Sequence, residues 1–221
     1  LTVTPAADYN GDIAVTVSAS DGSLTGIGTF TLSVTPVNDA PVIASISDQA
    51  IDEDTSFVFE VSATDVDGDN LTYSASNGNA VITVDGNTLT VIPEDDYNGD
   101  IEVTVIVTDG QVSDSGSFIL TVTPVNDAPV LSAVSDSSVA EDTDFELTLS
   151  AVDVDGDAVT FDATVDGNGS ASVSGNALTV TPAADYNGDI AVTVSASDGS
   201  LTDIGTFTLT VTPVNDAPVV D

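Results

Sequence analysis

The chain has 221 residues, a formal net charge of −37 and no Lys, Arg, His, Cys, Met or Trp. Phosphate binding requires cationic side chains, so nucleic acid and anionic membranes are excluded as partners, and no apolar stretch approaches the about 18 residues that a membrane helix requires. Most enzyme classes are excluded as well, because Ser and Cys nucleophiles and phosphoryl transfer depend on side chains that are absent.

A glycosidase needs only two carboxylates, one of them with its pKa raised in an apolar pocket. None of the repeated units described below has a long insertion that could build such a cleft. We therefore expect that the chain is not an enzyme.

The high charge raises the alternative of disorder, but 41% of the residues are hydrophobic. Apolar and polar residues alternate over long stretches, as in Phe57, Phe59 and Val61 and throughout 101–107. This period of two is typical of half-buried strands and predicts an all-β fold.

The sequence is built from repeats. Thr35–Val42 recurs at Thr123–Val130 and at Thr212–Val219, with spacings of 88 and 89 residues. A period of this length fits one small β-sandwich of about seven strands. We assign residues 1–37 to the last three strands of one repeat, 38–125 and 126–214 to two complete repeats, and 215–221 to a linker toward a following repeat.

In chain order, residues 1–37 come first, and the apolar faces of their strands lack the partner sheet that should cover them. We expect this segment to dock on material from another chain or to belong to a longer chain, with disorder as the alternative. In the first complete repeat the pattern predicts strands at 42–47, 55–64, 70–76, 79–84, 87–93, 100–108 and 114–124. The second complete repeat follows the same layout.

Residues 1–42 match residues 178–219 except at Gly26 against Asp203 and Ser33 against Thr210. Near-identical copies favour a role in which each copy adds length, because a catalytic domain seldom gains from unchanged repetition.

Alternating carboxylates form the sharpest local signal, in Asp65-Val-Asp67-Gly-Asp69 and again from Asp153 to Asp157. Such residues can converge on one hard cation, which in the case of calcium prefers several oxygen ligands. The motif is not an EF-hand, which needs Gly at position six and Glu at position twelve of its loop, where this chain has Asn70 and Ser76.

In the fixed order of these motifs the chain resembles the cadherin-like tandem repeats of very large bacterial surface adhesins. The resemblance covers the whole chain. Its carriers are the Val-Asn-Asp-Ala-Pro-Val junctions, Glu-Asp-Thr at 53–55 and 141–143, the Asp-Val-Asp-Gly-Asp loops, and the Tyr-Asn-Gly-Asp stretches. It implies tandem seven-stranded, Ig-like Greek-key sandwiches in a linear rod, with Ca²⁺ bound between successive repeats.

Carried over by motif, the resemblance assigns three calcium junctions. The first would use Asp8 or Asp12, Asn38, Asp39, Asp65, Asp67 and Asp109. The second would use Glu53, Asp96 or Asp100, Asn126, Asp127, Asp153, Asp155 and Asp198. The third, which lacks its following repeat, would use Glu141, Asp185, Asp189, Asn215 and Asp216. The animal linker reads Asp-x-Asn-Asp-Asn-x-Pro, and because the linker at 124–129 lacks its first Asp, we expect one or two ions per junction rather than three.

Some of these side chains have a simpler alternative. Asp before Gly often only caps its own turn, which applies to Asp67 and Asp155 taken singly. We interpret Asp48, Asp85, Asp136 and Asp166 as solvated turn residues. Tyr9, Tyr97 and Tyr186 recur at one position and are interpreted as corner tyrosines whose hydroxyls bond nearby backbone, rather than as a sugar-stacking platform.

The sequence thus predicts calcium-rigidified spacer repeats of a large extracellular bacterial adhesin, located at the cell surface or secreted. Its expected partners are calcium ions, adjacent repeats and other copies of the chain. The alternative is a module that binds carbohydrate or itself, including assembly into extracellular fibres by strand complementation.

Overall fold

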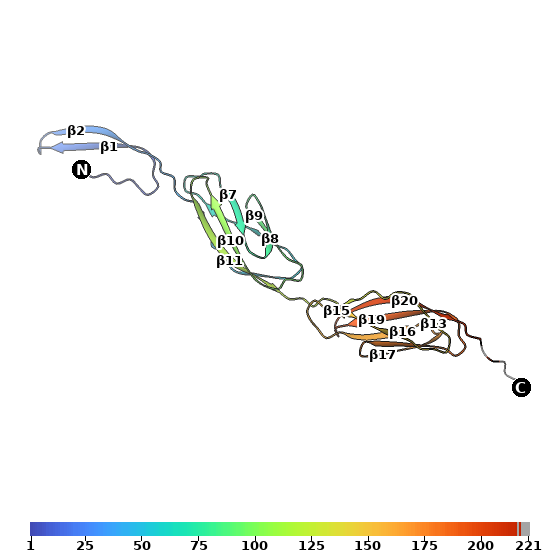
Figure 1. Cartoon of the computed structure of the whole chain (residues 1–221). Helices are drawn as coiled ribbons and strands as arrows, with labels where there is room; N and C mark the ends of the chain where they lie inside the picture. Colours follow the sequence, from blue (N-terminus) through green and yellow to red (C-terminus); the bar gives the residue numbers. More distant parts are fainter. Residues whose placement is uncertain (216, 218–221) are drawn as a thin grey trace. The chain divides into compact units, whose positions relative to one another are not determined.

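The computed structural model describes residues 1–215 and 217, in which there are twenty strands and no helix (Figure 1). No helix in this part of the chain could cross a membrane. The chain divides into two compact units, Leu1–Pro124 and the residues from Val125 onward. The all-β sandwich fold expected from the sequence is confirmed.

The first unit contains eleven strands. They are β1 (Gly11–Ser20), β2 (Thr25–Val34), β3 (Val42–Ile43), β4 (Gln49–Asp52), β5 (Phe57–Glu60), β6 (Ala63–Thr64), β7 (Thr72–Ser76), β8 (Ala80–Asp85), β9 (Thr88–Pro93), β10 (Gly99–Thr108) and β11 (Ser113–Thr123). The hairpin β1–β2 stands by itself, whereas β3 to β11 form the sandwich that we call the middle repeat.

The middle repeat packs one sheet of order β4-β11-β10-β7 against a second formed by β5-β9-β8, with the short pair β3-β6 beside it. Alternation along each strand sends every second residue inward. On β10, Val103 and Val107 have no exposed surface, while Glu102 between Ile101 and Val103 is exposed. Leu89 of β9 and Leu120 of β11 complete this core from the two facing sheets.

The second unit contains nine strands. They are β12 (Val130–Leu131), β13 (Ser137–Ala140), β14 (Phe145–Thr148), β15 (Ala151–Val152), β16 (Thr160–Val165), β17 (Gly169–Ser174), β18 (Ala177–Pro182), β19 (Gly188–Ser197) and β20 (Thr202–Thr212). Its sheets, β13-β20-β19-β16 and β14-β18-β17, repeat the order of the middle repeat. We call this sandwich the last repeat.

Of the predicted strand 42–47 only Val42–Ile43 (β3) forms a strand, and the strand β4 (Gln49–Asp52), which was not predicted, follows it in a different sheet. β3 pairs antiparallel with β6, whereas β4 pairs parallel with β11. Between them, the Asp48 carboxylate accepts the N–H of Ile119 on β11 at 2.8 Å, and Asp136 does the same for Thr208 at 2.7 Å. Both acids are exposed, as expected for solvated residues, but each also accepts a hydrogen bond from the backbone of a long strand, a role that the sequence did not indicate.

The predicted strand 55–64 is also broken, into β5 and β6. The break lies at Val61, whose N–H donates to the carbonyl of Asn87 at 2.8 Å and whose carbonyl accepts the Asn87 side-chain amide at 3.1 Å. Asn87 lies in the turn between β8 and β9. At Val61 the hydrogen bonds between strands are therefore replaced by hydrogen bonds to Asn87 in this turn.

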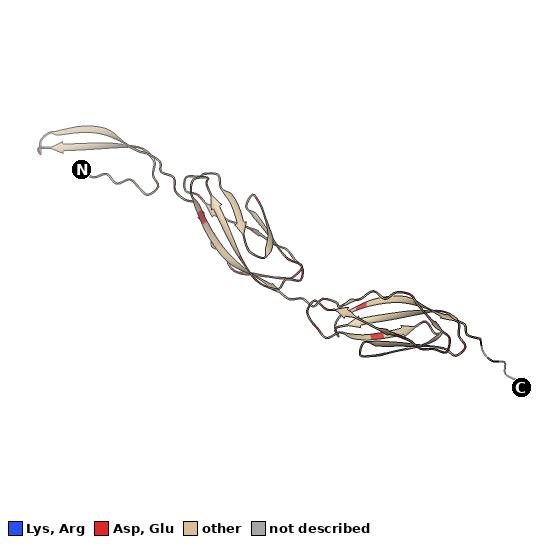
Figure 2. Cartoon of the chain, in the orientation of Figure 1, with Lys and Arg blue, Asp and Glu red and all other residues tan. Residues whose placement is uncertain are grey.

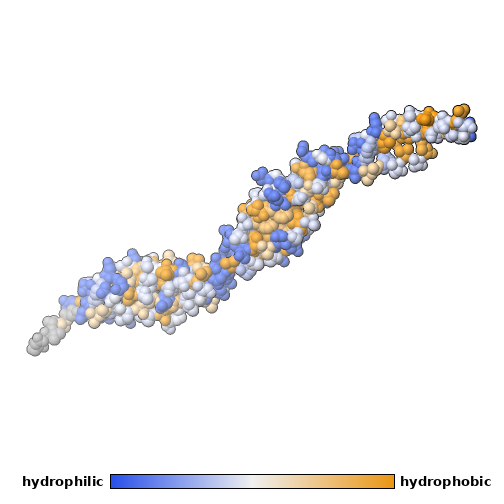
Figure 3. Space-filling view, turned by 180° about the vertical axis from the view of Figure 1, so that it is seen from behind, coloured by the Kyte–Doolittle hydropathy of each residue, from blue (hydrophilic) through white to orange (hydrophobic). Residues whose placement is uncertain are grey.

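The first segment forms two strands rather than the expected three. Leu1–Pro5 is not a strand, because in the last repeat the equivalent β18 lies between β14 and β17, and this segment has no counterpart of either. Phe30 is 47% exposed, whereas Phe207, in the same register of the near-identical β19–β20 hairpin, is 4% exposed. Hydrophobic surface is visible on this segment in Figure 3.

The corner tyrosines are confirmed. The hydroxyls of Tyr97 and Tyr186 donate to the carbonyls of Asp100 at 3.2 Å and Asp189 at 2.8 Å, and both rings pack on the cores. Gly188 has φ of 140°, and a Cβ there would lie 2.9 Å from the Tyr186 hydroxyl. The Tyr-Asn-Gly sequence therefore needs its glycine for both the backbone conformation and the close approach of the ring.

Candidate calcium site at the repeat ends

The linker before the middle repeat is hydrogen-bonded to that repeat's loops. The backbone N–H of Asp39 donates to Asp67 Oδ2 at 2.8 Å, and Asn38 Nδ2 donates to Asp109 Oδ2 at 2.8 Å. Gln111 Nε2 in turn donates to Asn38 Oδ1 at 2.6 Å. Side chains from the linker and from two loops are thereby gathered at one end of the sandwich.

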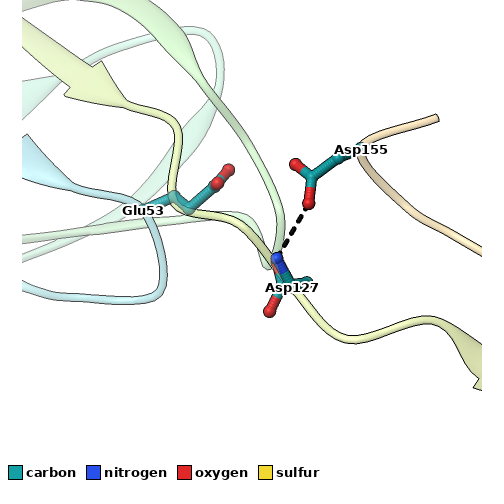
Figure 4. A group of neighbouring side chains, drawn as sticks. All are labelled: Glu53, Asp127 and Asp155. Atoms are coloured by element: carbon teal, nitrogen blue, oxygen red, sulfur yellow. Dashed lines mark hydrogen bonds between the residues drawn. The ribbon is translucent and has the colours of Figure 1, made fainter. Parts of the chain in front are cut away.

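The last repeat has the same arrangement. The backbone N–H of Asp127 donates to Asp155 Oδ2 at 2.8 Å, the dashed line in Figure 4, and Asn126 Nδ2 donates to Asp198 Oδ2 at 2.8 Å. Two repeats that differ in many side chains thus keep both bonds at the same distances. Asp67 and Asp155 are therefore more than caps of their own turns, because each binds the linker.

Asp65 and Asp153 lie at the start of these loops and carry the clearest sign of a missing ligand. Oδ1 of Asp65 accepts the N–H of Asp67 at 2.9 Å and that of Asp69 at 3.3 Å, and Oδ1 of Asp153 accepts that of Asp157 at 3.0 Å. In both residues Oδ2 is buried without a hydrogen-bond partner. A buried acceptor without a partner costs free energy unless a cation or water occupies the space beside it.

The donor set suits a hard cation. Carboxylate oxygens of Asp65, Asp67 and Asp69 come within 4.8 Å of one another, and every candidate ligand atom in these loops is oxygen. Calcium takes six to eight oxygen ligands, so three carboxylates, amide or backbone carbonyls and water can complete its shell. The residues present therefore fit calcium.

Within the first unit, Asp8 comes close to this loop. A cavity of about 280 Å³ is lined by Asp8, Asp39 and Asp67, among others, and a second of about 450 Å³ by Asp8, Asp39 and Asp65. Asp8 has φ of 58°, which aspartate tolerates better than most residues. Of the alternatives Asp8 and Asp12, the structure brings Asp8 to the loop.

Asp12, Asp100 and Asp189 instead serve their own hairpins. Their Oδ1 atoms accept the hydroxyls of Ser33 at 2.7 Å, Thr121 at 2.7 Å and Thr210 at 2.8 Å across the strand pair. All three acids are exposed. One carboxylate oxygen of each is thus engaged inside the repeat.

The opposite end of each repeat holds a buried glutamate. Glu53 is 3% exposed and Glu141 is 6% exposed, in a chain that contains no cationic side chain (Figure 2). Asn98 Nδ2 lies 3.5 Å from Glu53 Oε2, and Glu141 Oε1 accepts the N–H of Val214 at 2.6 Å. Glu141 therefore joins the end of the last repeat to the chain that leaves it, whereas Glu53 contacts the loop between β9 and β10 of its own repeat.

Sequence reasoning missed Asp54 and Asp142, which follow the two glutamates. Each has a positive φ, 59° and 57°, and its Oδ1 accepts the backbone N–H of Asp96 at 3.1 Å or Asp185 at 3.2 Å. The signal was present in the Glu-Asp-Thr motif, whose second acid sits beside the first. The structure thus pairs Asp54 with Asp96 and Asp142 with Asp185.

Two loop acids have pKa values that are lowered from the ordinary value. The Asn38 amide is the largest cause for Asp109, followed by the N–H groups of Val112 and Gln111. For Asp198 the N–H of Leu201 contributes most, followed by the Asn126 amide and the N–H of Ser200. Donors to the charged form hold both carboxylates ionised. Of the third predicted ligand set, Asp216 lies outside the described residues.

Comparison with known proteins identifies the family to which these repeats belong. The model of the bacterial Ig domain matches residues 38–123 and 126–210, and the chain belongs to that family. A curated relative, chitinase A of Pseudoalteromonas piscicida, is 30% identical over 167 residues, which are 73% of this chain. The chain spans 20% of the length of that chitinase.

Among solved structures, the human desmocollin-1 ectodomain matches with a TM-score of 0.52 at 16% identity, over 93% of this chain and 47% of that one. Human protocadherin-24 EC1-2 matches with a TM-score of 0.51 at 20% identity, over 80% of this chain and all of that one. At these identities the likeness concerns the fold: the chain is a tandem of Ig-like sandwiches with the architecture of cadherin ectodomains.

Proposed function

We propose that this chain is a calcium-stiffened spacer in a large extracellular protein of the adhesin type. The observation that supports it best is the orphaned Oδ2 of Asp65 and of Asp153, each in a loop whose next acid, Asp67 or Asp155, binds the linker. A cation at that oxygen would act on the loop and on the linker together. The proposed partners are therefore calcium and the adjacent repeats.

The proposed ligands come from the end of one repeat, the linker and the start of the next. For the first junction they are Asp8, Asn38, Asp39, Asp65, Asp67 and Asp109; for the second, Glu53, Asp54, Asp96, Asn126, Asp127, Asp153, Asp155 and Asp198; for the third, Glu141, Asp142, Asp185, Asn215 and Asp216. Asp12, Asp100 and Asp189 are weaker candidates because of their bonds within the hairpins.

The mechanism is mechanical. A sandwich with a close-packed core deforms little, so bending between repeats is concentrated in the linkers. Calcium shared across a linker removes that freedom and also stabilises the folded repeats by mass action, by about 1.4 kcal/mol when calcium is tenfold above its Kd. Extracellular calcium modules have Kd values of ~10⁻⁴–10⁻³ M, which fits millimolar calcium outside the cell.

The similarity to chitinase A supports a second kind of protein in which these repeats could act as spacers. The segment of that protein that matches this chain makes up 20% of its length. The repeats would then space the parts of a secreted polysaccharide-degrading enzyme rather than of an adhesin. Carbohydrate binding by the repeats themselves has less support, because aromatic residues are 5% of the chain and the corner tyrosines point to backbone carbonyls.

Small-angle scattering of the whole chain tests the proposal. With 5 mM calcium the maximum dimension should differ from that in excess chelator, and the distribution of conformations should narrow. Replacing Asp153 and Asp155 by Ala should abolish the response of the second junction only, while the matched change of Asp65 and Asp67 should abolish that of the first. Identical profiles with and without calcium would refute the proposal, and loss of both responses in either variant would refute the ligand assignment.

A further inference from the structure

The sheet β5-β9-β8 of the middle repeat has an apolar outer face. Val58, Val81 and Ile92 are 60%, 61% and 45% exposed, and Val81 lies directly opposite Ile92 in the ladder. Thr90 lies opposite both Val58 and Thr83. We call these five residues the β8 face.

The last repeat does not have this face. The residues at the positions of Val58, Val81 and Ile92 are Glu146, Ser170 and Thr181, on β14, β17 and β18. The two sandwiches share a topology, so the fold itself does not require apolar side chains there. Of the middle and the last repeat, only the middle repeat has the β8 face.

The same face ends in an open strand edge. β8 pairs with β9 on one side and is the last strand in its sheet. The two-residue turn at Gly86 and Asn87 makes Asp85 and Thr88 a hydrogen-bonded pair, and such pairs alternate along an antiparallel ladder. The N–H and C=O groups of Ile82 and Val84 therefore point to the open side.

The edge lacks the usual protection against pairing. Natural edge strands are commonly blocked by Lys, Pro, Gly bulges or inward-pointing charges, and β8 (Ala-Val-Ile-Thr-Val-Asp) has only Asp85 at its end. Its Val, Ile and Thr residues favour extended pairing. The equivalent edge β17 reads Gly-Ser-Ala-Ser-Val-Ser and is a poor strand template by comparison.

Charge restricts what can cover this edge. In a chain of net charge −37 without cations, two copies repel each other wherever their carboxylates meet. The β8 face contains no acid, and the nearest ones on that side, Glu60 and Asp85, flank Thr88 at the turn end of the sheet. A second copy can therefore bind to the β8 face without bringing carboxylates of the two copies together.

We infer that β8 pairs antiparallel with β8 of a second copy around a two-fold axis at Thr83. Ile82 of one copy then bonds Val84 of the other, and the two sheets form one of six strands. Asp85 lies opposite Val81, so the two Asp85 residues are about 13 Å apart at ~3.3 Å per residue, beyond the ~8 Å screening length at physiological salt. The contact is isologous, as in most homodimers.

A single cysteine tests this pairing, since the chain has none. In the dimer, Thr83 faces Thr83 as a non-hydrogen-bonded pair with Cβ atoms about 4.5–5.5 Å apart, close enough for a disulfide after a small shift. Under mild oxidation in excess chelator, Thr83→Cys should give covalent dimer at least ~10-fold faster than Ser172→Cys, the equivalent exposed site of the last repeat. Equal rates would overturn the proposal.

Two further measurements separate specific pairing from random collision. Adding Val81→Glu to Thr83→Cys should slow dimer formation to the rate of the control, whereas adding Ser170→Glu should not. Sedimentation of the unmodified chain in chelator should show dimer increasing from 20 to 500 mM NaCl, because salt screens the repulsion. Monomer at all salt concentrations up to millimolar protein would refute the pairing, and the chelator keeps this outcome independent of the calcium proposal.

Discussion

The backbone N–H of Asp127 donates to the carboxylate of Asp155 at 2.8 Å, and Asp39 makes the same bond to Asp67. A residue of the linker is thus bound to the repeat that follows it. The carboxylate that makes this bond stands two residues after the one whose Oδ2 is buried and unpaired. Linker and proposed cation site are therefore parts of one loop structure.

Removing this bond should loosen the linker without unfolding the repeat. In Asp155→Ala the amide of Asp127 should exchange with solvent roughly 10- to 100-fold faster in chelator, because a hydrogen bond to a charged acceptor contributes about 1.5–3 kcal/mol. Hydrogen exchange by NMR measures this rate. The Asp39 amide is the internal control and should keep its rate; acceleration at both sites would mean that the variant disturbs more than one loop.

Calcium affinity should depend on the orphaned oxygen. Asp153→Asn keeps the size of the side chain but removes its charge, and the Kd for calcium at sites of the last repeat should rise by about tenfold or more. Isothermal titration calorimetry provides the measurement. Asp166→Asn, an exposed turn acid in the same repeat, should leave the affinity within a factor of two, so an equal effect of both changes would point to general charge rather than to a site.

The two hairpins of nearly identical sequence allow a matched test of burial. Phe207→Ala should destabilise the last repeat by about 3–5 kcal/mol, because its ring is 4% exposed in the core beside Phe145. Phe30→Ala, at the same place in β2, removes a ring that is 47% exposed and should cost under about 1 kcal/mol. Urea unfolding followed by NMR signals of each segment compares them, and equal costs would show that the β1–β2 hairpin is covered in solution.

The lowered pKa of Asp198 gives a dependence on pH. In Asn126→Ala one donor to this carboxylate is lost, so its pKa should rise toward the ordinary value of ~4. Because the folded-state pKa lies below the unfolded one, the stability that the bond contributes is present above about pH 4 and is lost as pH falls through the folded-state pKa.

Carboxyl chemical shifts titrated in chelator measure this change. Asp109, whose amide donor is Asn38, is the matched control and should titrate as in the unmodified chain. A shift at Asp109, or no change at Asp198, would contradict the role given to the Asn126 amide.

Much of the fold could be predicted because its signals are local. Alternation predicts β10 and β11 nearly to the residue, and the repeated Tyr-Asn-Gly predicts the corner bond to Asp100. The strand β4 could not be predicted, since its place beside β11 is supported by contacts distant in sequence, such as the bond from Ile119 to Asp48, 71 residues away.

The candidate site likewise has features that the sequence predicts and features that only the fold determines. The spacing of Asp65 and Asp67 is readable from the sequence, and so is the linker motif. The preference for Asp96 over Asp100 as a proposed ligand cannot be read from the sequence, because it rests on the hydrogen bond from the Thr121 hydroxyl to the Asp100 carboxylate across the hairpin. Asp54 becomes a candidate only because its backbone, with a positive φ, brings its carboxylate to the N–H of Asp96.

The N–H of Val214 donates to Glu141, and Val214 opens the Val-Asn-Asp sequence that recurs in all three linkers of this chain. In the last repeat, the valine of the outgoing Val-Asn-Asp motif is held by the sandwich that it leaves, while the asparagine and aspartate of the incoming motif are held by the sandwich that they enter. The linker is therefore hydrogen-bonded to the preceding repeat up to its valine and to the following repeat from its asparagine onward. If calcium stiffens the linkers as proposed, we expect bending to be concentrated at the peptide between valine and asparagine, and inserting one glycine there should restore bending in the presence of calcium.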